Sequence, residues 1–360
     1  MNEAGVKLTT YFGERERAGH QFLADALQAL YARHEIHTSV LLRGVDGFGP
    51  SHHLHTDRQL SLSENLPAVS IAIDTAQRIG ETIGDVRALA GDGLISLERA
   101  RLIAGEGLRD PGIPADPEAS VKLTLYGGRG VRSGNQAGYV RAVRCLSEAG
   151  AIGASVLLAV DGTLHGERRR ARFFARNASV PLMLLALGSR ASLEAALPEL
   201  TALLDDPVMT LERVHIVKAA GRWLTDPVQV PEHDPSGLPN WCKLTVHVEE
   251  HARHAGRPVH IELVRRLREA GAAGATVLRG VRGFYADRDP VHDRLWSLRR
   301  TVPVSVIAID SPEAMRGWWP LIDEVTAEHG LVTSELVPAS HGLGVSALSL
   351  GDAPGPARSR

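Results

Sequence analysis

The stretch VKLTTYFGERERAGHQFLADALQALYARHEIHTSVLLRGVDGFG, residues 6–49, occurs three times in different versions. The second version is VKLTLYGGRGVRSGNQAGYVRAVRCLSEAGAIGASVLLAVDG from Val121, and the third is CKLTVHVEEHARHAGRPVHIELVRRLREAGAAGATVLRGVRGF from Cys242. Each version starts with a lysine in an apolar strand, continues through a helix and ends in a second strand. The lysine and the end of the second strand are equally far apart in all three versions. The chain therefore contains three tandem repeats of one unit.

The remainder of each repeat supplies a third strand, a second helix and a fourth strand. In repeat one these are PAVSIAID, TAQRIGETIGDVRALA and LISLERARLI, with Asp74 or Thr75 as the helix cap. Over the whole chain, helices are predicted at residues 20–33, 75–90, 136–148, 192–204, 258–270 and 312–328. The order strand, helix, strand, strand, helix, strand predicts a ferredoxin-like βαββαβ unit of the α+β class, with two helices on one face of an antiparallel sheet.

Segments rich in Pro, Gly and Asp separate the repeats and are typical of linkers. We place the repeats at 6–104, 120–218 and 241–338, the linkers at 105–119 and 219–240, and a disordered tail at 341–360. Helices on one face leave the other face of each sheet apolar, and third strands such as VPLMLLAL indicate burial on both faces. Packing the three sheets around a common axis would cover those faces.

The composition is that of a globular protein. The 360 residues are 44% hydrophobic and 23% charged, and the formal net charge of -2 gives no overall attraction to nucleic acid or anionic lipid. No stretch approaches the ~20 apolar residues that a membrane helix needs, and no basic segment with an apolar run begins the chain. Cys145 and Cys242 match no disulfide, metal or redox pattern and should be packed thiols. We expect a cytoplasmic protein that neither binds nucleic acid nor inserts into a membrane.

The motifs KLT-Y-GE, ATVLRGV-GF, LSENLP, IAID and GLISLE resemble the bacterial family called domain of unknown function 190. The resemblance covers nearly the whole chain as three copies, of which repeat two is degenerate. That family is grouped with PII-like and CutA-like proteins. The resemblance implies a ferredoxin-like subunit which, in PII-like proteins, forms a trimer with small ligands in the clefts between subunits. Three copies in one chain would then form a monomeric, intramolecular pseudo-trimer.

The strand ends Arg43-Gly44 and Arg279-Gly280 are candidate ligand contacts, because a planar guanidinium can grip a phosphate or carboxylate at two points. The repeat lysines need either an acidic partner or an anionic ligand. We assign ligand binding to Lys7, Arg43, Gly44, Gly47, Lys243, Arg279, Gly280 and Gly283. The alternatives are an ion pair between each arginine and a neighbouring repeat, and a carboxylate partner for each lysine.

Repeat two has Leu158 and Ala159 where the other repeats have Arg-Gly. If these positions form a site, repeat two has lost part of it. The turn at residues 91–96, AGDGLIS with its preceding alanine, resembles a phosphate-binding loop weakly, and a helix C-cap is the alternative.

Two groups of histidines make a divalent-metal site of CutA type the alternative function. They are His52, His53 and His55, and His247, His251 and His254. No carboxylate or cysteine stands at a diagnostic spacing from them, so no metal ligand is assigned. No P-loop, nucleophile elbow or H-E-x-x-H motif is present, so we expect neither an enzyme nor a cofactor.

We therefore expect a non-catalytic PII-like regulatory protein. It would bind a small anionic ligand, for example an adenine nucleotide, in clefts between repeats. It would contact an unidentified protein partner through long loops at 45–66, 161–179 and 281–302, since loops on a rigid scaffold commonly carry recognition.

Overall fold

The computed structural model describes residues 3–49, 55–56, 65–91, 93–103, 116–171, 178–204, 207–227, 230–233, 239–285 and 302–341. Within these residues the protein is a mixed α/β structure with three repeated units, six helices and large antiparallel sheets. The predicted tail beyond residue 341 and the linker residues 105–115 lie outside the described residues.

Each repeat contributes two helices, in the predicted order. They are α1 (Leu23–Arg33), α2 (Ala76–Ala90), α3 (Gly138–Glu148), α4 (Arg190–Leu204), α5 (Val259–Glu269) and α6 (Pro312–Val325). The hydroxyl of Thr75 caps α2 by accepting a hydrogen bond from the backbone N–H of Arg78, and Ser311 caps α6 in the same way. None of these helices is long and apolar enough to cross a membrane.

Four main strands in each repeat pair in the same order. They are β1 (Glu3–Gly13), β4 (Thr38–Arg43), β7 (Pro67–Thr75) and β8 (Leu94–Ile103) in repeat one; β9 (Ser120–Gly128), β12 (Gly153–Leu158), β15 (Pro181–Ser189) and β16 (Val208–Arg213) in repeat two; and β19 (Trp241–Glu249), β22 (Ala275–Arg279), β24 (Pro303–Asp310) and β25 (Leu331–Val337) in repeat three. The first strand lies between the third and the fourth, and the second strand pairs with the outer side of the third. All of these pairs are antiparallel.

A short hairpin precedes the first helix of each repeat. The hairpins pair β2 (Arg17–Ala18) with β3 (Gln21–Phe22), β10 (Arg132–Ser133) with β11 (Gln136–Ala137), and β20 (Arg253–His254) with β21 (Arg257–Pro258). The backbone of each hairpin reverses at a glycine with positive φ, at Gly19, Gly134 and Gly256.

The segments predicted as long loops begin with strands, which corrects the sequence-based prediction. These strands are β5 (Asp46–Phe48), β13 (Asp161–Leu164) and β23 (Arg282–Tyr285), with short partners β6 (His55–Thr56) and β14 (Glu167–Arg168) for the first two. Each of the three leaves its own repeat and pairs with the second strand of another: β5 with β22, β13 with β4, and β23 with β12. Sequence alone missed these strands because their hydrogen-bond partners lie in another repeat.

The ends of the repeats are exchanged as well. The far end of β8 pairs with β16 of repeat two, β17 (His215–Ala219) of repeat two pairs with β25, and β26 (Ala339–His341) of repeat three pairs with β8. The strand β18 (Arg222–Trp223), which pairs with β17, lies in the segment predicted as the second linker. Two strand exchanges therefore join each pair of repeats.

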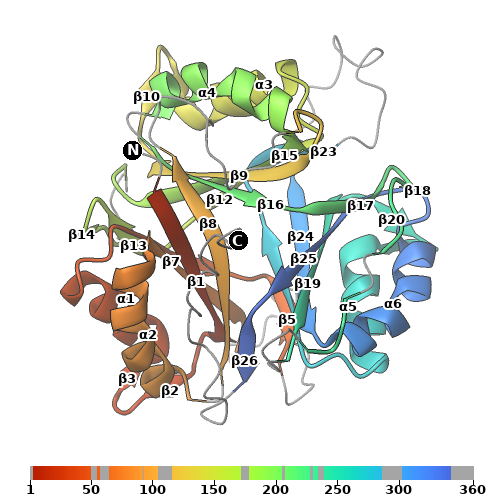
Figure 1. Ribbon diagram of the computed structural model, residues 1–360, viewed down its shortest axis with the longest axis horizontal. Helices are drawn as coiled ribbons and strands as arrows, with labels where there is room; N and C mark the ends of the chain where they lie inside the picture. Colours follow the sequence, from red (N-terminus) through yellow and green to blue (C-terminus); the bar gives the residue numbers. More distant parts are fainter. Residues whose placement is uncertain are drawn as a thin grey trace, which may run out of the picture.

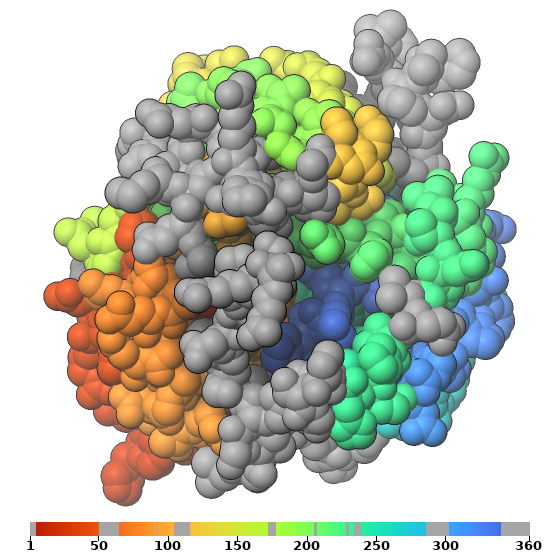
Figure 2. Space-filling view, viewed as in Figure 1, coloured from red at the N-terminus to blue at the C-terminus, as the bar shows by residue number. Residues whose placement is uncertain are grey.

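The sheets form the inside of the molecule and the helices form its outside, as Figure 1 shows. In the space-filling view, repeat one lies at the left, repeat two at the top and repeat three at the right (Figure 2). Each repeat has its own core between its helices and its sheet. A further core joins the inner faces of all three sheets, and it includes Val40, Ile71, Leu157, Met183 and Leu278. The predicted burial of both faces of the third strand is confirmed, because seven of the nine β15 residues are buried.

Glycine allows one exchanged strand to approach its neighbour closely. A Cβ at Gly162 would lie 2.2 Å from the carbonyl oxygen of Ser39 on β4. We expect Gly162→Ala to lower the free energy of unfolding by about 1–3 kcal/mol, because the strand would have to shift. Urea denaturation measures this.

The matched control is Gly49→Ala, since no atom in the described part of the chain lies within 4 Å of a Cβ at Gly49. Its stability should stay within about 0.5 kcal/mol of the wild type. Equal losses in the two variants would contradict the steric argument.

Candidate functional site

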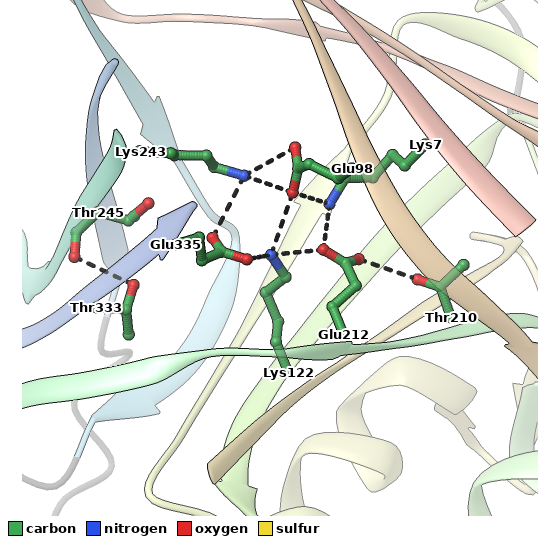
Figure 3. A network of polar contacts seen from close by, with 9 residues as sticks. All are labelled: Lys7, Glu98, Lys122, Thr210, Glu212, Lys243, Thr245, Thr333 and Glu335. Carbon is green, nitrogen blue, oxygen red and sulfur yellow. Dashed lines mark hydrogen bonds and ion pairs between the residues drawn. The ribbon is translucent and has the colours of Figure 1, made fainter. Parts of the chain in front are cut away.

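Three lysines and three glutamates meet in the buried centre of the molecule (Figure 3). Each repeat lysine lies directly opposite a glutamate on the fourth strand of its own repeat. The opposed pairs are Lys7 with Glu98, Lys122 with Glu212, and Lys243 with Glu335. The corresponding Nζ–Oε2 distances are 2.7 Å, 2.7 Å and 3.5 Å.

Each lysine also forms an ion pair with the glutamate of another repeat. These pairs join Lys7 to Glu212 at 2.6 Å, Lys243 to Glu98 at 3.0 Å, and Lys122 to Glu335. Every lysine therefore bridges two repeats, and the six side chains form a closed ring. We call this set of six residues the charge ring.

The charges in the ring stabilise one another against burial. Burial disfavours the charged form of Lys7, but the carboxylates of Glu212 and Glu98 outweigh it and raise the pKa of Lys7. Burial likewise opposes ionisation of Glu98, yet the surrounding lysines hold its pKa well below the usual value. All three lysine pKa values are raised, and that of Glu335 is lowered. The lysines and these glutamates are charged at neutral pH.

A small void of about 60 Å³ lies beside the ring. Two hydroxyls among its lining residues, Thr9 Oγ1 and Tyr126 OH, have no hydrogen-bond partner in the described structure. A polar void of this size suits a few water molecules and is too small for an organic ligand. The three ring carboxylates lie within 4.8 Å of one another, but the lysine charges between them oppose binding of a cation.

The ring uses two residues that sequence reasoning assigned to a ligand. Lys7 and Lys243 are buried and each is paired with two carboxylates. Carboxylate pairing was the alternative expected for these lysines. The partner glutamates were missed, although the sequence holds a signal for them: Glu98, Glu212 and Glu335 stand at matching places in the three fourth strands.

The arginines at the strand ends also have carboxylate partners. Arg279 donates from Nε and Nη2 to the two oxygens of Glu250, at 2.7 and 2.9 Å, and Arg43 pairs with Glu14. Each partner belongs to the same repeat as its arginine. In repeat two both members of the pair are replaced together, by Leu158 and Arg129.

The glycines assigned to the ligand lie where strands cross between repeats. Gly44 donates its N–H to the carbonyl of Pro67, and Gly280 donates to that of Pro303. A Cβ at Gly47 would lie 2.3 Å from the carbonyl oxygen of Ala275, and one at Gly283 would lie 2.2 Å from that of Ala154. These four glycines therefore permit the strand exchange.

A cavity of about 500 Å³ opens between repeats one and three. Repeat one lines it with the end of β1, the turn after α2 and the residue Gly49. Repeat three lines it with the start of β22, the two residues before that strand, and the inner face of β24. Most of the lining is apolar, and it includes Phe12, Leu23, Phe48, Leu94, Ile307 and Ile309. Neither Lys7 nor Arg43 is among the described lining residues.

Charged groups in the lining come from the hairpin before α1. Arg17 is exposed, donates from Nη1 to the carbonyl of His20 at 3.2 Å, and lies over the Phe22 ring. Glu16 accepts a hydrogen bond from the N–H of Gly13 at 2.7 Å. The turn at residues 91–96, which resembles a phosphate loop, contributes Gly91 and Gly93 to the lining. The cavity thus combines an apolar interior with one cation, Arg17, and one carboxylate, Glu16, both of which face solvent.

The histidines in the described residues do not gather into a metal site. Burial lowers the pKa of His247 to about 3, and its Nδ1 lies 2.9 Å from Ser305 Oγ. His251 pairs with Glu249, whereas His254 pairs with Glu324. Among the described side chains, the group close enough to share a metal ion is the three ring glutamates. His52 and His53 lie outside the described residues, and so does the side chain of His55.

Both cysteines are packed thiols, as expected. Cys145 and Cys242 are free and buried. Burial raises the pKa of Cys145 to about 12 and that of Cys242 to about 11, so neither is a reactive thiolate at neutral pH.

The fold and the cavity define a protein of three α/β repeats with a hollow between two of them. A family model described as "Uncharacterized ACR", DUF190, matches residues 5–102, 120–216 and 241–339. The chain belongs to this family, and it contains three copies of the family's unit.

One curated relative is the UPF0166 protein of Aquifex aeolicus (strain VF5). It is 31% identical over 93 residues, which make up 26% of this chain and 86% of the relative. The relative is thus little longer than one repeat. A crystal structure of an unknown protein from Galdieria sulphuraria is 11% identical and covers 61% of this chain and 96% of its own, with a TM-score of 0.18. A likeness this low carries no argument.

The charge ring should be essential for stability. Glu98 contacts all three lysines, so Glu98→Gln would leave buried positive charge unbalanced. We expect the free energy of unfolding in urea to fall by about 3–5 kcal/mol.

Glu14→Gln is the matched control, because it removes an exposed partner of Arg43. Its loss should stay below about 1 kcal/mol. A Glu98→Gln variant as stable as Glu14→Gln would show that the ring contributes little.

The ring also predicts how stability depends on pH. The pKa values of Glu98 and Glu335 lie below 4.5 in the folded state, so their contribution is present above about pH 4.5 and is lost as pH falls through the folded values. The lysine pKa values lie above 10.5, so their contribution is present below about pH 10.5 and is lost as pH rises through the folded values. We expect a plateau in unfolding free energy between about pH 5 and 10. If, below about pH 5, the unfolding free energy of Glu98→Gln fell by as much as that of the wild type, this assignment would be contradicted.

Proposed function

We propose that this chain is a non-catalytic, PII-like regulatory protein that binds a small anionic ligand between repeats one and three. The observation that carries the proposal is the cavity of about 500 Å³ at that boundary. Small-molecule sites in proteins typically measure about 300–1,000 Å³, are mostly apolar and hold a few polar groups that orient the ligand. The cavity has each of these properties.

We propose further that the three repeats are ferredoxin-like units in a monomeric pseudo-trimer. The strand order in each repeat, with the first strand between the third and fourth, supports the unit. The charge ring and the paired strand exchanges support the assembly, because each needs all three repeats. A curated relative about as long as one repeat is consistent with a subunit that has been joined into one chain.

An adenine nucleotide fits the distribution of chemistry in the cavity. The apolar lining, with Phe12 and Phe48, suits a planar base. The guanidinium of Arg17 can form charge-assisted hydrogen bonds with a phosphate. Gly91 and Gly93 allow the backbone to approach a ligand closely.

Ligand binding could be transmitted to a protein partner through the exchanged strand. Phe48 ends β5 and lines the cavity, and the segment that we expect to contact a partner continues from it. A ligand that contacts both repeats would favour one position of β5, from which this segment continues.

Isothermal titration of the purified full chain with ATP tests the proposal. We expect saturable binding in the wild type. The affinity of Arg17→Ala should be at least about tenfold weaker, because a charge-assisted hydrogen bond is worth about 1.5–3 kcal/mol. Arg132→Ala, at the matching position of repeat two, is the control and should bind like the wild type.

Other results of this titration would contradict the proposal. No heat with ATP would exclude this nucleotide as the ligand. A loss of binding in the Arg43→Ala/Arg279→Ala double variant, with Arg17→Ala unaffected, would move the site to the strand ends. Light scattering that shows a stable trimer of 360-residue chains would contradict the monomeric pseudo-trimer.

A further inference from the structure

Three residues stand at the same repeat position, at the ends of the exchanged strands: Leu164 and Tyr285 are the last residues of β13 and β23, and Gly49 directly follows β5. Leu164 faces Thr38 of repeat one, and Tyr285 faces Gly153 of repeat two. Gly49 follows β5 beside Gly274 of repeat three, where a Cβ on Gly274 would lie 3.7 Å from the Cα of Gly49. The three boundaries between repeats therefore differ in the side chain at one position.

Tyr285 fills the boundary between repeats three and two. Its ring is buried, and it packs in a cluster with Leu187 and Leu331. A Cβ at Gly153 would lie 2.6 Å from Cδ1 of this ring, so the ring fits tightly against the neighbouring strand. The ring centroids of Tyr285 and His247 are 5.2 Å apart.

The residues around Tyr285 have counterparts that line the cavity between repeats one and three. Leu331 on β25 lies opposite His247 on the adjacent strand β19. In repeat one, Leu94 on β8 lies opposite Tyr11 on β1 in the same way. Leu94 and Tyr11 line the cavity.

The match extends to the strand from the neighbouring repeat. Leu187 lies opposite Lys122, as Ile309 lies opposite Lys243. Ile309 also lines the cavity. The cavity is thus the place that the Tyr285 ring occupies at the other boundary.

Gly49 leaves that place open. It lines the cavity, and a Cβ built on it would meet no atom of the described residues within 4 Å. At the boundary between repeats two and one, Leu164 is partly buried and packs against the inner core. A glycine in repeat one, in place of leucine or tyrosine, accounts for the space there.

We infer that the cavity binds an aromatic ring of its ligand where repeat three places the ring of Tyr285, and that Gly49 is the residue that keeps this place open. This inference rests on the proposed function, and it specifies the class of ligand as one that carries a planar aromatic ring. The place that the Tyr285 ring occupies in repeat three favours uncharged groups, because burial raises the pKa of Tyr285 to about 12 and lowers that of His247 to about 3. The apolar lining of the cavity has the same preference.

The probe for this inference is p-cresol, which has the structure of a free tyrosine side chain. We expect saturable shifts of the Ile307 and Ile309 methyl signals when p-cresol is added to the full chain. Gly49→Tyr should abolish these shifts, because the chain then supplies its own ring. Gly49→Ala should retain them, since a methyl group leaves most of the cavity free. Gly49→Leu, the residue of repeat two, is a second filling variant in case the tyrosine variant does not fold.

Each outcome decides the inference. Saturable shifts that are lost in Gly49→Tyr or Gly49→Leu, and kept in Gly49→Ala, support it. No saturable shift in the wild type, or shifts that persist in folded filling variants, would overturn it. Binding of p-cresol without binding of ATP would sink the nucleotide proposal and leave this inference intact.

Discussion

The charge ring is the interaction on which the arrangement of the three repeats depends. Six buried side chains alternate in sign, and each lysine contacts glutamates from two repeats. Burying an isolated charge is strongly unfavourable, and each lysine here has one carboxylate from its own repeat and another from a neighbour, so packing the repeats together completes its charge balance. A well-packed apolar centre could be equally stable, but it would tolerate small rotations and register shifts. Beyond its effect on stability, the ring favours one register of the inner strands, because a one-residue slip of any of them would separate opposite charges.

The exchanged strands also tie each repeat to its neighbours, through backbone hydrogen bonds. The second strand of each repeat would otherwise have an exposed edge with unpaired N–H and C=O groups. Pairing that edge with a segment from another repeat satisfies those groups and leaves helices only on the outside (Figure 1). Glycines at Gly47, Gly162 and Gly283 recur at the crossing points because any side chain there would collide with a carbonyl oxygen. Because the repeats share both the charge ring and the exchanged strands, each repeat depends on its neighbours for its charge pairing and for its backbone hydrogen bonds.

Covalent linkage permits the three boundaries to differ around a shared centre. Separate identical subunits must carry identical clefts, whereas tandem repeats can change one at a time. Here the aligned residue at the end of the exchanged strand is Gly49, Leu164 or Tyr285, and the space between repeats changes with it. The arginine and glutamate of the strand-end ion pair are likewise both absent from repeat two.

The sequence by itself determined the three repeats, the six helices, the main strands and the family, because periodicity, capping and equal spacing are local properties. It also indicated that the lysines need partners and that the third strands are buried on both faces. Only the tertiary structure decided which glutamates pair with the lysines, that the loop starts are strands, and that the open cavity lies beside Gly49 rather than at Arg43. Each of these depends on contacts between residues in different repeats, far apart in the chain, and such contacts leave no periodic signal in either partner. The sequence alone likewise leaves the roles of Arg43 and Arg279 open, since strand-end ion pairs and ligand contacts look alike in a sequence.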